Sequence, residues 1–71
     1  MDKTRMEGTI TRVIKTRGFA FVVGEDQVER FVHVDELREP ERWEEMRQGV
    51  RVSFVPVRTK KGDRASEVEF L

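Results

Sequence analysis

The amino-acid sequence predicts an all-β fold, a small five-stranded antiparallel barrel with a short helical turn between the third and fourth strands. One observation behind this prediction is a series of short runs rich in β-branched and aromatic residues, separated by turn-forming residues. Another is a chain of only 71 residues without cysteine, in which no disulfide can reinforce a small core. A sheet that closes on itself leaves no exposed edge strand, so a barrel is favoured.

The five predicted strands follow from local composition. They cover residues 9–14, 19–23, 28–34, 50–57 and 64–70. Gly18 ends the first turn, because glycine is free to adopt a positive φ. Residues 24–27 and the basic loop at 58–63 provide two further turns.

One segment does not read as strand. Residues 35–48 are charged and poor in β-formers, with Pro40 placed as a first helical residue and Gly49 as a stop signal. We expect one or two helical turns there. Their apolar contacts are predicted to be Leu37, Trp43 and Met46.

The organisation of the chain is simple. It has no repeat and no flexible linker, which predicts a single domain over residues 1–71. Residues 1–7 lack the apolar run of a signal peptide, and no stretch approaches the roughly 20 apolar residues that span a bilayer. The absence of cysteine suits a reducing compartment. We therefore expect a cytoplasmic protein without a membrane partner, and a monomer is favoured.

Charge is balanced overall but segregated along the chain. Fourteen basic side chains face fourteen acidic ones, which by itself argues against a strong nucleic-acid binder. However, residues 1–23 carry five basic and two acidic side chains, and residues 47–64 carry six basic side chains against Asp63. Residues 24–46 hold most of the acids. A fold that brings the two basic segments to one side would create a positive face.

Strand periodicity predicts which side chains share a face. In the second strand, Phe19 and Phe21 alternate with Ala20 and Val22, which are suited to a core. In the third strand, Phe31 and His33 likewise lie opposite Val32. If the two strands are neighbours, four rings lie together on the face away from the core: Phe19, Phe21, Phe31 and His33.

Five segments, in order, resemble the cold-shock domain family. Residues 17–22, Arg-Gly-Phe-Ala-Phe-Val, resemble its first ribonucleoprotein motif, Lys-Gly-Phe-Gly-Phe-Ile. Residues 30–34, Arg-Phe-Val-His-Val, resemble the second, Val-Phe-Val-His-Phe. Residues 7–10 are similar to the opening Glu-Gly-x-Val, residues 46–54 to Leu-x-x-Gly-x-x-Val-x-Phe, and residues 61–68 to the closing Lys-Gly-Pro-x-Ala-x-x-Val.

The resemblance implies a barrel of the OB type that binds single-stranded RNA or DNA, as the family's RNA chaperones do, with low sequence specificity. It places the four rings at base-stacking positions, Trp43 at a loop aromatic that touches bases, and Arg17 at the basic residue of the first motif. Rings stack on bases without reading sequence, and nearby cations neutralise phosphates. The predicted nucleic-acid-binding residues are Arg12, Arg17, Phe19, Phe21, Phe31, His33, Trp43, Lys60 and Lys61.

The sequence also departs from the family. Arg12 and Val13 stand where the family has Trp-Phe, and Ile14 replaces the Asn that follows. Val34 replaces the final Phe of the second motif, and Thr11 replaces a Lys. Three aromatic positions are lost, although the Arg12 guanidinium can stack on a base. These changes predict a weaker or differently tuned binder, or a member that serves another partner.

Other interpretations of the same residues stay open. The phenylalanines are also suited to a core, His33 to an ordinary satisfied histidine, Trp43 to a packing anchor, and the two lysines to solvated loop charges. The whole domain also fits a protein-interaction barrel, or a translation-factor-like barrel acting on the ribosome. Oligonucleotide affinity separates the first of these from the nucleic-acid binder, and co-sedimentation with ribosomal subunits separates the second.

Catalysis is not predicted. The chain has no nucleophile–base pair and no phosphate-cradling glycine loop, and one histidine without cysteine makes no metal site. We expect neither a cofactor nor a small-molecule substrate.

Overall fold

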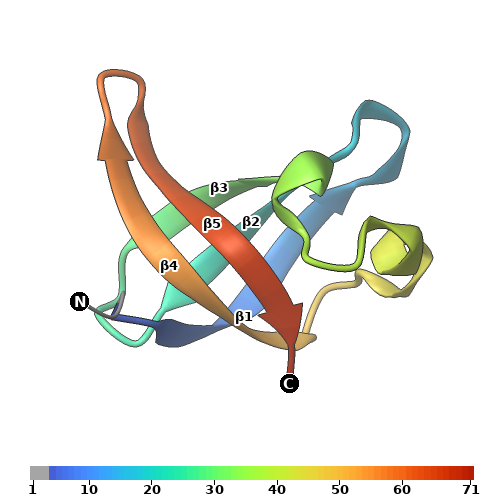
Figure 1. Ribbon diagram of the computed structural model, residues 1–71, viewed down its shortest axis with the longest axis horizontal. Helices are drawn as coiled ribbons and strands as arrows, with labels where there is room; N and C mark the ends of the chain where they lie inside the picture. Colours follow the sequence, from blue (N-terminus) through green and yellow to red (C-terminus); the bar gives the residue numbers. More distant parts are fainter. Residues whose placement is uncertain (1–3) are drawn as a thin grey trace.

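Five strands close into a barrel in the computed structural model, which describes residues 4–71. The strands are β1 (Met6–Ile14), β2 (Phe19–Gly24), β3 (Glu29–His33), β4 (Arg51–Thr59) and β5 (Gly62–Phe70). They follow one another around the barrel in the order β1-β2-β3-β5-β4. Figure 1 shows β4 and β5 as a long hairpin that crosses the sheet formed by β1, β2 and β3. The five-stranded barrel predicted from the sequence is confirmed.

The sheet is mixed, and the antiparallel arrangement predicted from the sequence holds for four of the five strand pairs. β1–β2, β1–β4, β2–β3 and β4–β5 are antiparallel, whereas β3 and β5 run parallel, with Phe31 opposite Arg64. The reason is topological. Direction alternates between antiparallel neighbours, so a closed ring with an odd number of strands must contain at least one parallel pair.

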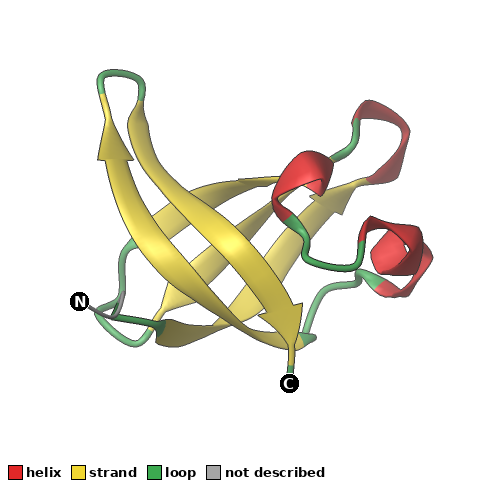
Figure 2. Cartoon of the chain, viewed as in Figure 1, coloured by secondary structure: helices red, strands yellow, loops and turns green. Residues whose placement is uncertain are grey.

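Short 3₁₀ turns fill the connections. η1 (Lys15–Arg17) joins β1 to β2, and η2 (Val34–Glu36) and η3 (Pro40–Glu45) lie between β3 and β4. Figure 2 shows all the helical turns gathered on the same side of the barrel. Pro40 begins η3 as predicted, but η3 ends at Glu45, before Gly49. Gly49 instead donates its N–H to the Ile10 carbonyl, as the chain turns into β4.

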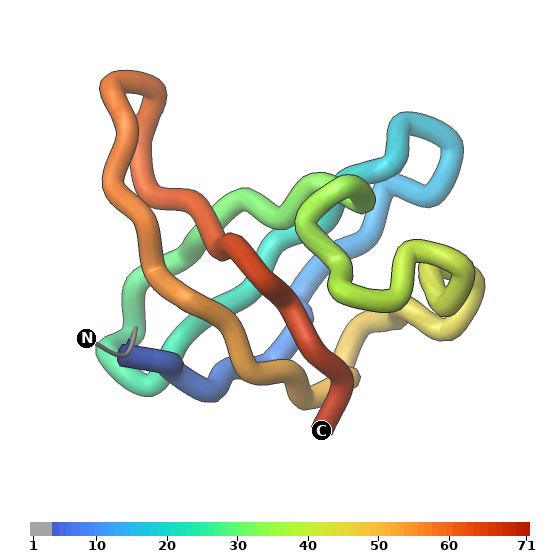
Figure 3. Tube along the Cα trace, in the orientation of Figure 1, coloured from blue at the N-terminus to red at the C-terminus, as the bar shows by residue number. Residues whose placement is uncertain are grey.

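The core occupies the inside of the barrel. Its apolar members are Ile10, Ala20, Val22, Val32, Leu37, Met46, Val52, Phe54, Ala65 and Val68. The predicted inward positions of Ala20, Val22 and Val32 are therefore confirmed, and the segment traced between β3 and β4 in Figure 3 contributes Leu37 and Met46. Trp43 is only partly buried and packs against the core cluster.

A bulge in β1 decides which way its second half faces. Ile10 pairs with Val22, but Arg12 pairs with Phe21, so Thr11 is an extra residue in the ladder. Ile10 is fully buried, whereas Arg12 is exposed. The bulge therefore shifts the alternation by one residue, so that Arg12 lies on the outer face although it follows the buried Ile10 by two residues.

Candidate nucleic-acid interface

The strand register places five of the nine predicted site residues, together with two others, in two rows across the outer face of the barrel. One row runs from β1 through β2 and β3 to β5 and consists of Arg12, Phe21, Phe31 and Arg64. The next row consists of Ile14, Phe19 and His33. Residues paired directly across antiparallel strands point to the same side of the sheet. The alternation predicted from the sequence is thus realised as one continuous surface, which we call the aromatic face.

The three phenylalanines of the aromatic face form one cluster. The ring centroid of Phe19 lies 5.8 Å from that of Phe21 and 5.2 Å from that of Phe31, and Phe21 and Phe31 are 6.0 Å apart. These spacings are those of favourable aromatic pairs. All three side chains are half-buried and lie outside the core cluster. The sequence-based alternative of core phenylalanines does not describe their position.

His33 continues the aromatic face along β3. Its ring centroid lies 6.4 Å from that of Phe31, and 38% of its side chain is exposed. Its Nδ1 accepts a hydrogen bond from the backbone N–H of Asp35 at 3.1 Å. This bond places the proton of the neutral ring on Nε2, which leaves a donor for a ligand.

Gly18 explains why the turn before Phe19 takes its shape. Its φ of 71° ends η1, and its N–H donates to the carbonyls of Ile14 and Lys15. A Cβ at this position would approach Val34 Cγ1 to 3.1 Å. Arg17 is exposed directly before this glycine, at the edge of the aromatic face where β2 begins.

Trp43 is held by the β1–β2 turn rather than by the phenylalanines. Its indole Nε1 donates to the Lys15 carbonyl at 3.4 Å, and Lys15 Nζ donates to the Trp43 carbonyl at 2.6 Å. Lys15 Nζ also lies 5.5 Å from the centroid of the indole ring. Trp43 takes part in none of the ring–ring contacts found within residues 4–71. The packing role considered from the sequence describes these contacts.

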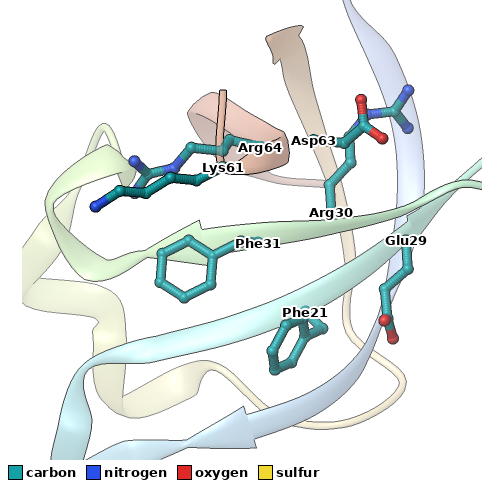
Figure 4. Close-up of a pocket in the computed structure, with 7 residues that line it drawn as sticks. All are labelled: Phe21, Glu29, Arg30, Phe31, Lys61, Asp63 and Arg64. Carbon is teal, nitrogen blue, oxygen red and sulfur yellow. The ribbon is translucent and has the colours of Figure 1, made fainter. Parts of the chain in front are cut away.

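The β4–β5 hairpin brings cations to the other end of the aromatic face. Lys60 and Lys61 are exposed at its tip, and the Arg64 guanidinium carbon lies 5.0 Å from the Phe31 ring centroid. Lys61 and Arg64 line a hollow of about 450 Å³ together with Phe21 and Phe31 (Figure 4). The hollow places Lys61, one of the two predicted lysines, beside two of the predicted rings.

Two residues of this surface, Ile14 and Arg64, were not among the predicted site residues. A period of two from Arg12 places Ile14 on the same face, and this signal was available in the sequence. Arg64 belongs to the basic segment recognised from the sequence, but its place beside Phe31 follows from the parallel β3–β5 pairing.

Ion pairing separates the arginines of the barrel into two groups. Five of them contact carboxylates: Arg5, Arg30, Arg38, Arg42 and Arg51. Within residues 4–71, no carboxylate pairs with the cations at the aromatic face, namely Arg12, Arg17, Lys60, Lys61 and Arg64. Arg47 and Arg58 likewise pair with no carboxylate of the described residues 4–71. Because many acids are engaged elsewhere, a chain of zero net charge can still present positive charge here.

The ion-paired arginines and acids have pKa values shifted by their mutual hydrogen bonds. Hydrogen bonds from the Arg30 guanidinium lower the pKa of Asp26 to about 2, and the same contact raises the pKa of Arg30. Hydrogen bonds from Arg42 lower the pKa of Glu45, and those with Glu45 and Glu39 raise the pKa of Arg42. Asp26 and Glu45 remain ionised at neutral pH, so they keep their ion pairs with the arginines.

Two other features, a metal-binding cluster and a membrane-spanning helix, are absent from residues 4–71. No group of three or more histidine, cysteine or acidic residues is arranged to hold a metal ion. None of the helical turns in this part of the chain has the length and apolar character that crossing a membrane requires.

Comparison with models of protein families matches residues 6–71 to the 'Cold-shock' DNA-binding domain. A search of curated proteins finds no match. The family match covers almost the whole chain, and it includes every strand of the barrel and every residue of the aromatic face. With the fold and the arrangement of the motif residues in agreement, the chain belongs to the cold-shock domain family, whose members bind single-stranded nucleic acids.

Proposed function

We propose that this protein binds single-stranded RNA or DNA by stacking bases on the aromatic face, with low sequence specificity. In this role it would act like an RNA chaperone, which keeps strands unpaired. The observation that carries the proposal is the cluster of Phe19, Phe21 and Phe31, which is half-exposed on the outside of the barrel.

The cost of leaving three rings on the surface supports a ligand. An aromatic side chain gains most of its stabilising free energy by leaving water, and a cluster kept outside the core gives up part of that gain. A base that stacks on such a ring removes its remaining surface from water and contributes about 1–3 kcal/mol. Every base has a π face, so stacking of this kind discriminates little between sequences.

Unpaired cations support a charged strand as that ligand. Arg17 lies at the end of the aromatic face where β2 begins, and Lys60 and Lys61 lie at the hairpin tip near its other end. A strand stacked along β2 and β3 would pass between them. Cations that contact phosphates release condensed counterions, which adds a favourable, salt-dependent term.

A fluorescence anisotropy titration tests the proposal. A labelled uridine or thymidine octamer should bind, and a blunt duplex should bind much more weakly, because its bases are already stacked on each other. A quenched RNA hairpin should open as protein is added, which tests the chaperone part. Equal affinity for single strand and duplex would contradict base stacking. Trp43 is the single tryptophan, so quenching of its emission on binding would place a base beside it.

Two phenylalanine variants link the binding to the aromatic face. Phe31→Ala should weaken octamer binding by about 1–3 kcal/mol, because one stacking partner is lost. Its unfolding free energy should fall much less than that of Phe54→Ala, which removes a fully buried ring and should cost about 3–5 kcal/mol. Thermal and denaturant unfolding of both variants gives the comparison. A loss of stability in Phe31→Ala equal to that in Phe54→Ala would mean that Phe31 serves the fold rather than a ligand.

A further inference from the structure

The hollow beside Phe31 has a charge arrangement that base stacking alone does not need. Besides Arg30 and Asp63, which also line it, the hollow is lined by a carboxylate, Glu29, and by two cations, Lys61 and Arg64, around the rings of Phe21 and Phe31. In Figure 4 the carboxylate of Glu29 points away from Lys61 and Arg64, and the two rings lie between the opposite charges. The hollow has a volume of about 450 Å³, which is within the range of small-ligand sites.

These three charged groups are held apart and unengaged. Within residues 4–71, the side chains of Glu29, Lys61 and Arg64 form no ion pair with one another or with another charged group. Arg64 is positioned by its cation–π contact with Phe31. The second arginine of the hollow, Arg30, is different, because Asp26 binds it through contacts of 2.6 and 3.0 Å.

The strand geometry explains why Glu29 and Arg64 do not meet. Glu29 precedes Phe31 by two residues on β3 and therefore shares its face, so it lies along the strand from the ring. Arg64 lies across the strand from the ring, because β5 pairs with β3 at this point. An acceptor and a donor are thereby offered in two different directions from the Phe31 ring.

We propose that this hollow is a guanine subsite, an inference that rests on the proposed single-strand binding. Guanine has two N–H donors together on its Watson–Crick edge, and two acceptors, O6 and N7, together on another edge. A carboxylate can accept from both donors at once, and an arginine can donate to both acceptors at once. The flat base would stack on one of the two rings, which stand at 76° to each other, with Glu29 on one edge of the base and Arg64, assisted by Lys61, on the other.

The other bases match this arrangement less well. Adenine places its amino donor beside an acceptor on both of these edges, so it meets the carboxylate and the guanidinium with one mismatched group each. Uracil offers a single ring N–H between two carbonyls, which the carboxylate would repel. Cytosine offers one amino group to Glu29 and keeps its acceptors on the same edge. Among the four bases, only guanine can form two hydrogen bonds with the carboxylate and two with the guanidinium.

The experiment measures the affinity of uridine octamers that carry one central guanosine, adenosine or cytidine, relative to the all-uridine octamer. The guanosine octamer should bind about tenfold more tightly than the all-uridine octamer, the size of one good bidentate contact. Glu29→Gln and Arg64→Lys should each bring this ratio close to one. Arg64→Lys keeps the positive charge but loses the planar fork, so it separates base reading from phosphate attraction.

Modified bases assign each edge. Inosine lacks the amino group of guanine, so replacing guanosine by inosine should weaken binding to the wild type but not to Glu29→Gln. 7-Deazaguanosine lacks N7, and its penalty should disappear in Arg64→Lys. Glu44→Gln is the matched control, because this exposed acid forms no hydrogen bond or ion pair within residues 4–71 and is not part of the hollow. It should keep the full guanine preference.

The outcomes are distinguishable. If no octamer binds, single-strand binding and the guanine subsite are both overturned. If all octamers bind equally, single-strand binding stands and the guanine subsite is overturned. A guanine preference that survives in both Glu29→Gln and Arg64→Lys would arise from stacking area alone and would also overturn the subsite. Thermal melts of the variants confirm that each is folded when it is titrated.

Discussion

At the scale of the residue, Arg12 is the position where this chain differs most in chemistry from the family pattern that it otherwise follows. It lies on the aromatic face directly opposite Phe21 of β2, because the bulge at Thr11 turns it outward. A guanidinium there offers a smaller plane than an indole, together with a charge and about 2 kcal/mol of side-chain entropy to lose on ordering. The row that contains Phe21 and Phe31 therefore begins and ends with an arginine, Arg12 on β1 and Arg64 on β5.

Arg12→Trp should tighten binding of a single-stranded pyrimidine octamer, because stacking area increases and less side-chain entropy is lost. It should also reduce the salt dependence of binding by up to about 0.7 in log K against log[salt], the share of one phosphate contact. Titrations of the wild type and the variant at two salt concentrations measure both effects. Unchanged affinity with an unchanged slope would exclude Arg12 from the binding surface. Weaker binding would indicate that its charge matters more than its plane.

At the scale of the element, two connections carry the cations that flank the aromatic face. The β1–β2 turn holds Arg17 at the end of β2 that pairs with His33, and the β4–β5 hairpin holds Lys60 and Lys61 near the end of β3 that begins with Glu29. Figure 1 shows these two connections projecting from different ends of the barrel. A bound strand is therefore expected to run along β2 and β3, with its phosphates meeting cations at both ends.

The hairpin tip should account for part of the salt dependence of binding. If Arg12, Arg17, Lys60 and Lys61 together contact about three phosphates, log K should fall against log[salt] with a slope of about −2. The double variant Lys60→Gln, Lys61→Gln should make the slope less steep by about 0.7–1.4, which corresponds to one or two contacts. Arg47→Gln removes an exposed charge outside the hairpin and should leave the slope unchanged. A slope near zero in the wild type would mean that the basic segments do not form a phosphate track.

At the scale of the whole molecule, one charged side chain is buried among the described residues 4–71. Arg30 lies on the inner side of β3 with 7% of its surface exposed, and its guanidinium carbon is 5.6 Å from the ring centroid of the core residue Phe54. Asp26 neutralises it from the β2–β3 turn at 2.6 Å. A buried cation without this partner would be strongly unfavourable, so the contact links the turn to the stability of the whole barrel.

The Asp26–Arg30 ion pair predicts how the stability of the fold depends on pH. The pKa of Asp26 is lowered from 3.8 to about 2 in the folded state, first of all by its hydrogen bonds with Arg30. A carboxyl with a depressed folded-state pKa stabilises the fold fully above pH 4, and this contribution is lost as the pH falls toward 2. Asp26→Asn should therefore melt at a lower temperature at pH 7, and its melting temperature should fall less than that of the wild type between pH 4 and pH 2.

Thermal melts at pH 7, 4, 3 and 2 measure this difference. Glu44→Gln is the control, because it removes an acid that has no partner within residues 4–71 and should follow the wild-type profile. Parallel acid profiles for the wild type and Asp26→Asn would show that the Asp26–Arg30 contact does not contribute to the pH dependence.

The sequence alone determined the five strands and the alternation within them, which sets Ala20, Val22 and Val32 opposite Phe19, Phe21 and Phe31. It could do so because strand periodicity is local, and a period of two needs no knowledge of the partner strand. That the three rings share one face depended on the pairing of β2 with β3. The parallel β3–β5 pair was also implicit in the odd number of strands, although the antiparallel prediction overlooked it.

Only the tertiary structure decided which residues from distant segments meet. The place of Arg64 beside Phe31 and the binding of Trp43 to Lys15 depend on barrel closure, and the outward position of Arg12 depends on the bulge at Thr11. The ion pairs of Arg5, Arg38 and Arg51 with carboxylates of distant segments have the same origin. The physical reason is that ion pairs and ring contacts act over a few ångströms in space, and only the closed barrel brings residues from distant strands within that range.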